Sequence, residues 1–92
     1  MKEERAEILA TGLVQGVGFR YFVVRKAALL DLKGFTQNLI TGDVLTVAEG
    51  PRAKLEELIE QIKIGPISAH VKSVHVKWRE ATGEFNSFEV RY

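Results

Sequence analysis

The 92-residue sequence predicts a single-domain α+β fold, in which two helices cover one face of an antiparallel (mixed) sheet. Three observations support this fold class. Two stretches space their apolar residues as amphipathic helices do, and shorter stretches between them are typical of strands. Glycine-containing turns separate the stretches. Apolar and polar residues alternate in the strands, which indicates a sheet with one face covered and one face wet.

The first half of the chain is expected to fold as strand, loop and helix. The strand covers residues 6–14 and the loop covers residues 15–19. The helix runs from residue 20 or 21 to about residue 32, and Gly34 is expected to end it. Its apolar residues, which share one face or lie beside it, are Val23, Val24, Ala27, Ala28 and Leu30.

The middle of the chain predicts a hairpin and a second helix. Residues 34–40 and 44–49 are expected to be strands joined by the turn 41–43. Pro51 suits the first turn of the helix that follows, and Gly65-Pro66 stops that helix. The apolar stripe of this helix consists of Leu55, Leu58, Ile59 and Ile62.

Two more strands complete the pattern. Residues 73–79 alternate strictly, and a last strand follows the turn at residues 82–83. The order is therefore β-α-β-β-α-β with one further strand, which is the ferredoxin-like split βαβ arrangement. The aromatic side chains expected in the core are Trp78, Phe85, Phe88 and Tyr92.

Composition excludes several classes of function. The formal net charge is only +1, from 13 basic and 12 acidic residues, so a nucleic-acid partner is not expected. The absence of cysteine excludes disulfides, thiolate metal sites and cysteine nucleophiles. His70 and His75 would face opposite sides of one strand, so no metal or cofactor is expected. No apolar run approaches a membrane span, and a cytoplasmic location is the expectation.

The loop before the first helix has the chemistry of a phosphate site. Glycines at positions 16 and 18 let backbone N–H groups turn toward a ligand, and the first amides of a helix attract anions. Arg20 follows at the helix start, and its planar fork can hold two phosphate oxygens. The loop is not a dinucleotide fingerprint, because Tyr21 stands where a third glycine is needed, and no Walker Gly-Lys-Ser/Thr follows.

The residues around this loop resemble a known family. Gly12-Leu13-Val14-Gln15-Gly16-Val17-Gly18-Phe19-Arg20 is similar to the first signature of the acylphosphatases. Gly34-Phe35-Thr36-Gln37-Asn38, followed by Gly42, Val44 and Gly50, is similar to their second signature. Gly65-Pro66 and Phe88-Glu89-Val90 also agree, so the resemblance covers nearly the whole chain. The departures are Ala10, Leu13 and Thr36, all expected on strands.

The resemblance implies metal-independent hydrolysis of an acyl phosphate to a carboxylate and inorganic phosphate. Arg20 and Asn38 match the two functional positions of the family. Asn38 would place the attacking water. The residues that would bind the phosphate are Gln15, Gly16, Val17, Gly18, Phe19 and Arg20. The implied partners are small acyl phosphates and inorganic phosphate, which would be both the product and a competitive inhibitor. Acyl phosphates with different acyl groups are all expected to be substrates. Membrane binding is not expected, and the chain is expected to be a monomer.

Other functions remain open at this point. A ferredoxin-like domain can be a binding module without hydrolase activity, for instance one that stacks RNA bases on strand aromatics. It can also handle carbamoyl phosphate inside a larger maturation protein, or be an enzyme-derived fold that has lost activity. The sequence lacks the aromatic strand motif of RNA binders and retains both functional residues of the family. Hydrolysis is therefore the favoured hypothesis.

Overall fold

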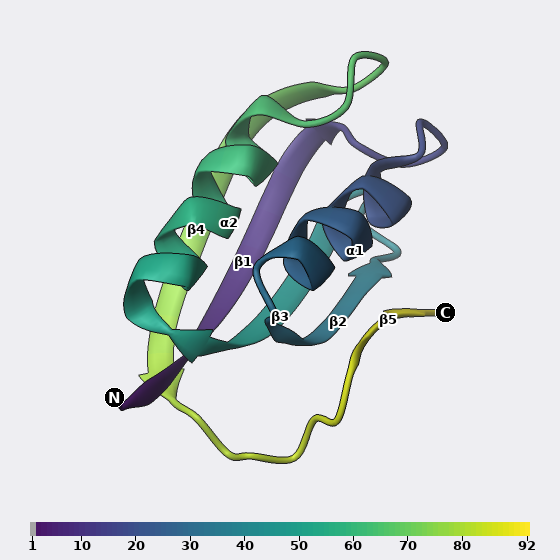
Figure 1. Cartoon of the computed structure of the whole chain (residues 1–92). Helices are drawn as coiled ribbons and strands as arrows, with labels where there is room; N and C mark the ends of the chain where they lie inside the picture. Colours follow the sequence, from purple (N-terminus) through teal and green to yellow (C-terminus); the bar gives the residue numbers. More distant parts are fainter. Residues whose placement is uncertain (1) are drawn as a thin grey trace.

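A computed structural model, which describes residues 2–92, confirms the predicted α+β arrangement. A five-stranded sheet of order β4-β1-β3-β2-β5 lies under two helices that cover one of its faces (Figure 1). The elements are β1 (Glu3–Leu13), α1 (Phe19–Leu29), β2 (Lys33–Asn38), β3 (Val44–Pro51), α2 (Arg52–Ile64), β4 (His70–Glu80) and β5 (Phe88–Arg91).

The pairing of the strands makes the sheet mixed. Strand β1 lies between β4 and β3 and is antiparallel to both, and β2 and β3 form the expected antiparallel hairpin. Strand β5 pairs with β2 in parallel and forms an edge of the sheet. As a result β1, β2 and β5 end at the same end of the molecule, where α1 begins and α2 ends.

The core fills the space between the helices and the sheet. The four stripe residues of α2 are all buried, as their spacing predicts. Every second residue of β1 from Ala6 to Ala10 is buried against them. Each fully buried large aliphatic side chain contributes roughly 1.5–3 kcal/mol to folding. In α1 the buried residues are Phe19, Phe22, Val23 and Ala27, whereas Ala28 is exposed.

Helix α1 ends earlier than expected, and by a different device. The last helical residue is Leu29, not residue 32, and Gly34 already belongs to β2. Asp31 adopts the left-handed conformation with φ of 58°, and the Leu32 N–H donates to the Ala27 carbonyl at 2.9 Å. This is the Schellman pattern, in which Asp31 takes the place that glycine usually has. Buried Leu32 then returns the chain to the core.

Several strand ends also differ from the prediction, because pairing continues beyond the alternating segments. Strand β1 begins at Glu3 rather than residue 6, since its polar start pairs with the end of β3. Strand β4 begins at His70, which pairs with Leu13. Pro51 is not in the first turn of α2. It is extended, with φ of −62° and ψ of 141°, and directly precedes the helix.

The register between β1 and β4 shifts between Thr11 and Gly12. This irregularity interrupts the two-residue alternation along β4, so the expectation that His70 and His75 face opposite sides does not follow from their spacing. Both histidines are exposed. Neither helix described within residues 2–92 has the length and apolar character needed to cross a membrane.

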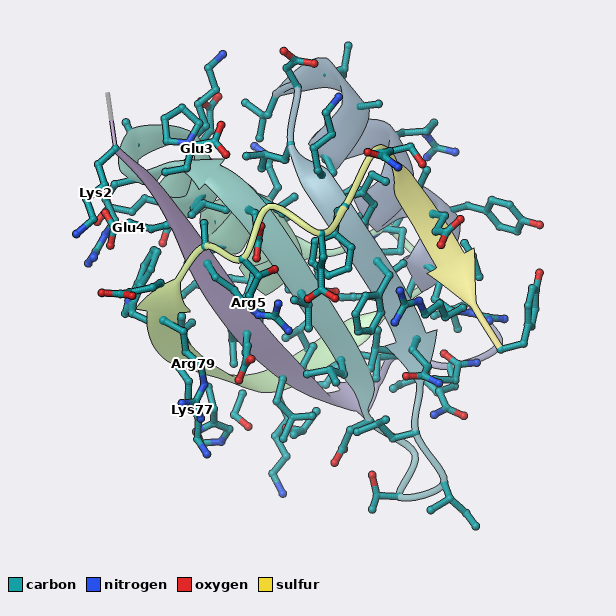
Figure 2. All side chains as sticks on the ribbon, turned by 90° about the horizontal axis from the view of Figure 1, so that it is seen from below. Lys2, Glu3, Glu4, Arg5, Lys77 and Arg79 are labelled. Carbon is teal, nitrogen blue, oxygen red and sulfur yellow. The ribbon has the colours of Figure 1, made fainter. Side chains whose placement is uncertain are left out.

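Alternation suggests that the second face of the sheet is exposed to water, but part of this face is covered. Residues 81–87, which connect β4 to β5, run across this face (Figure 2). Under this crossover segment Phe35 and Val47 are buried, and the ring of Phe85 packs edge-on against Phe35 at 5.8 Å. Tyr92, expected in the core, is instead 89% exposed because it lies beyond the end of β5. The remaining aromatics expected in the core, Trp78, Phe85 and Phe88, are half-buried.

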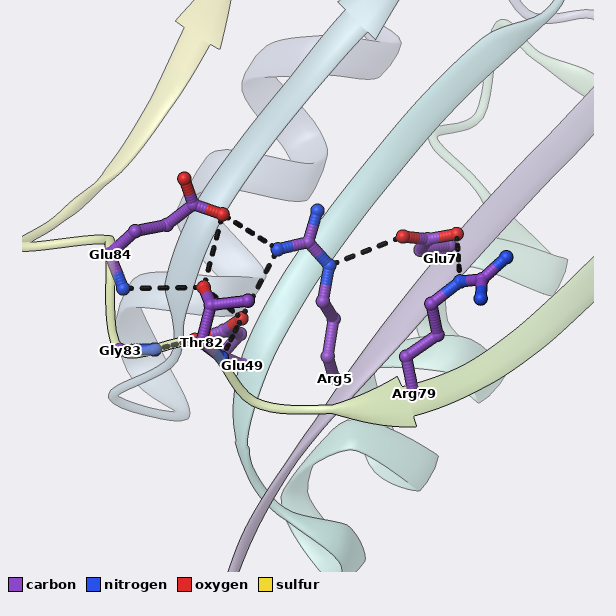
Figure 3. Close-up of polar contacts among 7 residues, drawn as sticks. All are labelled: Arg5, Glu7, Glu49, Arg79, Thr82, Gly83 and Glu84. Atoms are coloured by element: carbon purple, nitrogen blue, oxygen red, sulfur yellow. Dashed lines mark hydrogen bonds and ion pairs between the residues drawn. The ribbon is translucent and has the colours of Figure 1, made fainter.

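A polar cluster holds the crossover segment against the sheet. Its residues, which we call the Glu49 cluster, are Arg5, Glu7, Glu49, Arg79, Thr82, Gly83 and Glu84 (Figure 3). The Glu49 carboxylate is only 3% exposed. It accepts hydrogen bonds from the backbone N–H groups of Thr82 at 2.9 Å and Gly83 at 3.0 Å. The cluster thereby fixes the segment that leads into β5.

Arg5 is the centre of charge in this cluster. Its guanidinium contacts Glu84 at 2.8 Å, Glu7 at 3.2 Å and Glu49 at 3.3 Å. Burial acts to raise the pKa of Glu49, but the donors from Thr82, Gly83 and Arg5 outweigh it and hold the pKa below its ordinary value. The hydrogen bond from Arg79 lowers the pKa of Glu7 in the same direction.

Candidate active site

The loop after β1 and the start of α1 form a concave site together with the end of β2. Val14 is buried and anchors the loop to the core. Gly18 is the residue before α1 and has φ of 76°, a left-handed conformation that glycine adopts without strain. Its carbonyl accepts the Phe22 N–H at 3.1 Å, which begins the helical hydrogen bonding. The backbone therefore turns sharply from strand to helix at this point.

A cavity of about 110 Å³ lies at this turn. The residues that line it come from the loop, from the first turn of α1 and from the end of β2: Val14, Gly16, Gly18, Phe19, Arg20, Tyr21 and Asn38. Five of the residues predicted for the site thus meet in one cavity. Gln15 and Val17, which were also predicted, do not line it. Val17 packs against the hydrophobic core instead.

The start of α1 gives the cavity its positive character. The first amides of a helix have no acceptor within the helix and carry the positive end of its dipole. None of residues 2–92 caps this end of α1 with a side-chain hydrogen bond, and its first turn contains no acidic residue. The exposed N–H groups and the neighbouring Arg20 therefore suit a small anion such as a phosphoryl group.

Arg20 is held from the side of β5. It is the second residue of α1 and is half-buried. Its Nη1 donates a long hydrogen bond of 3.5 Å to the Arg91 carbonyl, and its guanidinium lies 5.0 Å from the centre of the Tyr92 ring. Both contacts orient the guanidinium while leaving donors free for a ligand. No sequence pattern indicated this support, because Arg91 and Tyr92 are remote from Arg20 in the chain.

Asn38 lies at the last position of β2, where it pairs with Val44 of β3. Its Oδ1 atom is buried and has no hydrogen-bond partner in the described part of the chain. A buried polar atom without a partner costs roughly 1–3 kcal/mol. Because Asn38 also lines the cavity, its amide is a candidate partner for a ligand or a water molecule there.

The side chain of Gln15 supports the phosphate loop rather than lining the cavity. Its side-chain Nε2 donates to the carbonyls of Leu39 at 2.7 Å and Asp43 at 2.9 Å. Both amide hydrogens are therefore engaged by the β2–β3 turn, and the side chain braces the loop. The backbone N–H of Gln15 remains the group that would contact phosphate, as the prediction for residues 15–20 states.

Tyr21 is the lining residue that sequence reasoning did not select. It was noted only as the residue that occupies the third glycine position of a dinucleotide motif. Its position one residue after Arg20 was the available signal, because neighbouring residues in a first helical turn can border the same ligand. Its side chain is 62% exposed at the cavity.

The chain is similar to known proteins over nearly its whole length. The acylphosphatase family model matches residues 6–90. The chain is 47% identical to an acylphosphatase of Moorella thermoacetica over 87 residues, which are 95% of this chain and 92% of the relative. It is 44% identical to an acylphosphatase of Chlorobaculum tepidum, with 98% of each chain covered. The crystal structure of acylphosphatase from Bacillus subtilis superposes with a TM-score of 0.93 at 34% identity, covering 97% of this chain and 99% of that one.

Proposed function

The chain belongs to the acylphosphatase family and hydrolyses acyl phosphates, and we propose that Arg20 with the loop amides binds the phosphoryl group while Asn38 orients the attacking water. The proposal rests above all on one cavity that joins the loop, the start of α1 and Asn38. No observation favours the alternative of a binding module without hydrolase activity.

The reaction needs little covalent help from the protein. Water attacks phosphorus while the bond between phosphorus and the carboxyl oxygen breaks, so that R–COO–PO₃²⁻ and H₂O give R–COO⁻ and H₂PO₄⁻. The leaving carboxylate is stable at neutral pH and requires no general acid. Phosphoryl transfer passes through a loose transition state, so catalysis consists mainly of positioning and charge stabilisation. Arg20 and backbone N–H groups supply both, and we propose that the reaction is metal-independent.

Phosphate recognition is assigned to two kinds of donor. The proposed backbone donors are the N–H groups of residues 15–20, of which Phe19 and Arg20 lie in the first turn of α1. The Arg20 guanidinium adds a planar pair of donors and a permanent positive charge. These contacts strengthen as charge redistributes over the phosphoryl oxygens in the transition state.

Asn38 is assigned to the water. Its carboxamide is neutral and cannot act as a base, but its buried oxygen can accept a hydrogen bond from a water molecule. A water held in this way is aligned for in-line attack, which lowers the entropic part of the barrier. The proton of the water then passes to the phosphoryl group itself. A turnover rate that stays constant while the substrate phosphate is titrated would contradict this last step.

Further properties stay predictions. Inorganic phosphate is expected to compete with substrate, because it presents the same oxygens to the same donors. The chain is expected to act as a single domain over residues 1–92, as a cytoplasmic monomer, and without a nucleic-acid partner.

The test is hydrolysis of benzoyl phosphate in excess chelator, with and without inorganic phosphate. We expect chelator-resistant turnover that phosphate inhibits competitively. Arg20→Ala should lose at least about 10²-fold in kcat/KM, the scale of removing one transition-state donor. Arg20→Lys should recover only part of this loss, because an ammonium lacks the planar fork. Turnover abolished by chelator, or equal in wild type and Arg20→Ala, would contradict the proposal.

A further inference from the structure

Large exposed apolar side chains gather at the end of the molecule that carries the active site. Seven large hydrophobic side chains are exposed within residues 2–92, and six of them belong to segments at this end: Leu13, Tyr21, Ile40, Ile64, Ile67 and Tyr92. They follow the ends of β1, β2, α2 and β5 or lie in the first turn of α1. Leu29, at the far end of α1, is the exception. Scattered exposed apolar residues are normal, but six of these seven belong to segments at one end of the molecule.

Tyr21 connects this apolar rim to the phosphate cavity. Of the six side chains it is the one that lines the cavity, and it follows Arg20 in the first turn of α1. Tyr92 is already engaged, because its ring lies over the Arg20 guanidinium. The Tyr21 ring is therefore the apolar surface available to a ligand whose phosphate occupies the cavity.

The chemistry of the substrate fits this arrangement. In an acyl phosphate the acyl substituent is only a few bonds from phosphorus and must leave the cavity on the side opposite the loop amides. We propose that Tyr21 is the contact surface for the acyl group, and that the enzyme therefore prefers acyl phosphates with aromatic or bulky apolar acyl groups over those with small ones. This inference rests on the proposed function. It narrows the broad acyl specificity that the sequence led us to expect.

Tyr21 acts on specificity in this account and not on the chemical step. An aromatic side chain offers a rigid surface, and covering it with an apolar group releases water from both. The contact between the acyl group and the ring stabilises the ground state and the transition state alike, so it lowers KM more than it raises kcat. Its size follows the apolar area of the acyl group, which is large for benzoyl and minimal for acetyl.

The test compares benzoyl phosphate with acetyl phosphate in wild type, Tyr21→Ala, Tyr21→Phe and Leu29→Ala. Comparing the ratio of the two kcat/KM values between variants cancels the difference in intrinsic reactivity between the two substrates. We expect Tyr21→Ala to lower the benzoyl-to-acetyl ratio about tenfold, mainly through KM for benzoyl phosphate, which is the scale of one lost apolar contact. Tyr21→Phe should retain the ratio because it keeps the ring. Leu29→Ala, an exposed apolar truncation at the other end of α1, should also retain it.

The outcomes separate the inference from the function on which it rests. If wild type hydrolyses neither substrate, the proposed function fails. If it hydrolyses both, and Tyr21→Ala lowers both kcat/KM values by the same factor, only the role of Tyr21 fails. The role of Tyr21 also fails if the exposed apolar side chains are instead a surface for a second copy of the chain. In that case Ile40→Ser and Ile67→Ser would lower the molecular mass in sedimentation, while the benzoyl-to-acetyl ratio of kcat/KM stayed unchanged.

Discussion

The side-chain amide of Gln15 donates a 2.7 Å hydrogen bond to the carbonyl of Leu39, and so ties the phosphate loop to the residue that follows Asn38. A second bond from the same nitrogen reaches Asp43 at the other side of the turn. The two halves of the site come from β1–α1 and from β2–β3, which are separate in sequence. Gln15 therefore sets the distance between the groups that bind phosphate and the group that orients water.

Loss of this brace should affect turnover more than phosphate binding. Gln15→Ala leaves each carbonyl with one backbone partner, since Leu39 and Asp43 also bond within their own turn. We expect the free energy of unfolding to fall by only about 1 kcal/mol. We expect kcat to fall about tenfold, because the loop and Asn38 are no longer held in register. Urea denaturation measures the free energy of unfolding, steady-state kinetics measures kcat, and the inhibition constant of phosphate measures phosphate binding.

Gln15→Glu is the matched control for the brace. The carboxylate keeps the length of the side chain but cannot donate to either carbonyl. It should therefore lose at least as much turnover as Gln15→Ala. Wild-type turnover in Gln15→Glu would show that the two hydrogen bonds do not position the site.

Asn38 should separate stability from activity. Asn38→Ala removes a buried oxygen that has no partner in residues 2–92, so the protein should lose no more than about 0.5 kcal/mol of stability. Turnover should fall at least about 10²-fold because the water is no longer oriented, while phosphate still binds. Urea denaturation, kcat and phosphate inhibition test the three statements. Asn86→Ala, in the exposed crossover segment, should change none of them.

Gly18 and Gly34 should respond differently to the same substitution. A Cβ at Gly34 would collide with the backbone carbonyl of Val47 in the neighbouring strand. A Cβ at Gly18 would meet no atom within 4 Å, so its cost is only the left-handed backbone, about 1–2 kcal/mol. We therefore expect Gly34→Ala to lose more unfolding free energy than Gly18→Ala. When phosphate binding is measured per folded molecule, only Gly18→Ala should weaken it, because Gly18 directs the first amides of α1. Equal stability losses would contradict this distinction.

Local patterns predicted most of the fold. The stripe of α2 identified all four of its buried residues, because helical spacing depends on neighbours within a few turns. The hairpin of β2 and β3 followed from a short turn between two strands. The predicted end of α1 was wrong, because Asp31 adopts a left-handed conformation that is usually assigned to glycine.

Long-range contacts could not be predicted in the same way. Alternation in the last strand indicated a covered face, but not that β5 would pair in parallel with β2. It also placed Tyr92 in the core, whereas the strand ends one residue before and the ring lies over Arg20. Glu49 is buried, and it accepts hydrogen bonds from Thr82 and Gly83 of the segment 81–87, which is remote from it in the chain. Motifs identified five of the residues that line the phosphate cavity, but not Tyr21. They also did not identify Arg91 and Tyr92, which contact Arg20 from β5 and the residue after it.

The Glu49 cluster predicts how stability depends on pH. Burial acts to raise the pKa of Glu49, but the hydrogen bonds from Thr82, Gly83 and Arg5 bring it below the ordinary value of 4.5. A carboxylate whose pKa is lower in the folded state stabilises the protein fully above its unfolded pKa, and this contribution is lost as the pH falls through the folded pKa. Glu7 and Glu84 shift in the same direction, so they add to the loss. The free energy of unfolding should therefore decrease as the pH falls below about 4.5.

Glu49→Gln isolates the contribution of the buried carboxylate. At pH 7 we expect this variant to be less stable than wild type by about 2 kcal/mol, the scale of hydrogen bonds to a charged group. As the pH falls the difference should shrink, because the wild-type carboxylate becomes protonated when the pH passes through its lowered pKa. Urea denaturation from pH 7 to pH 3 measures the difference, with exposed Glu57→Gln on α2 as the control. A difference that stays constant over this range would mean that Glu49 fastens the crossover segment through its shape and neutral hydrogen bonds, and not through its charge.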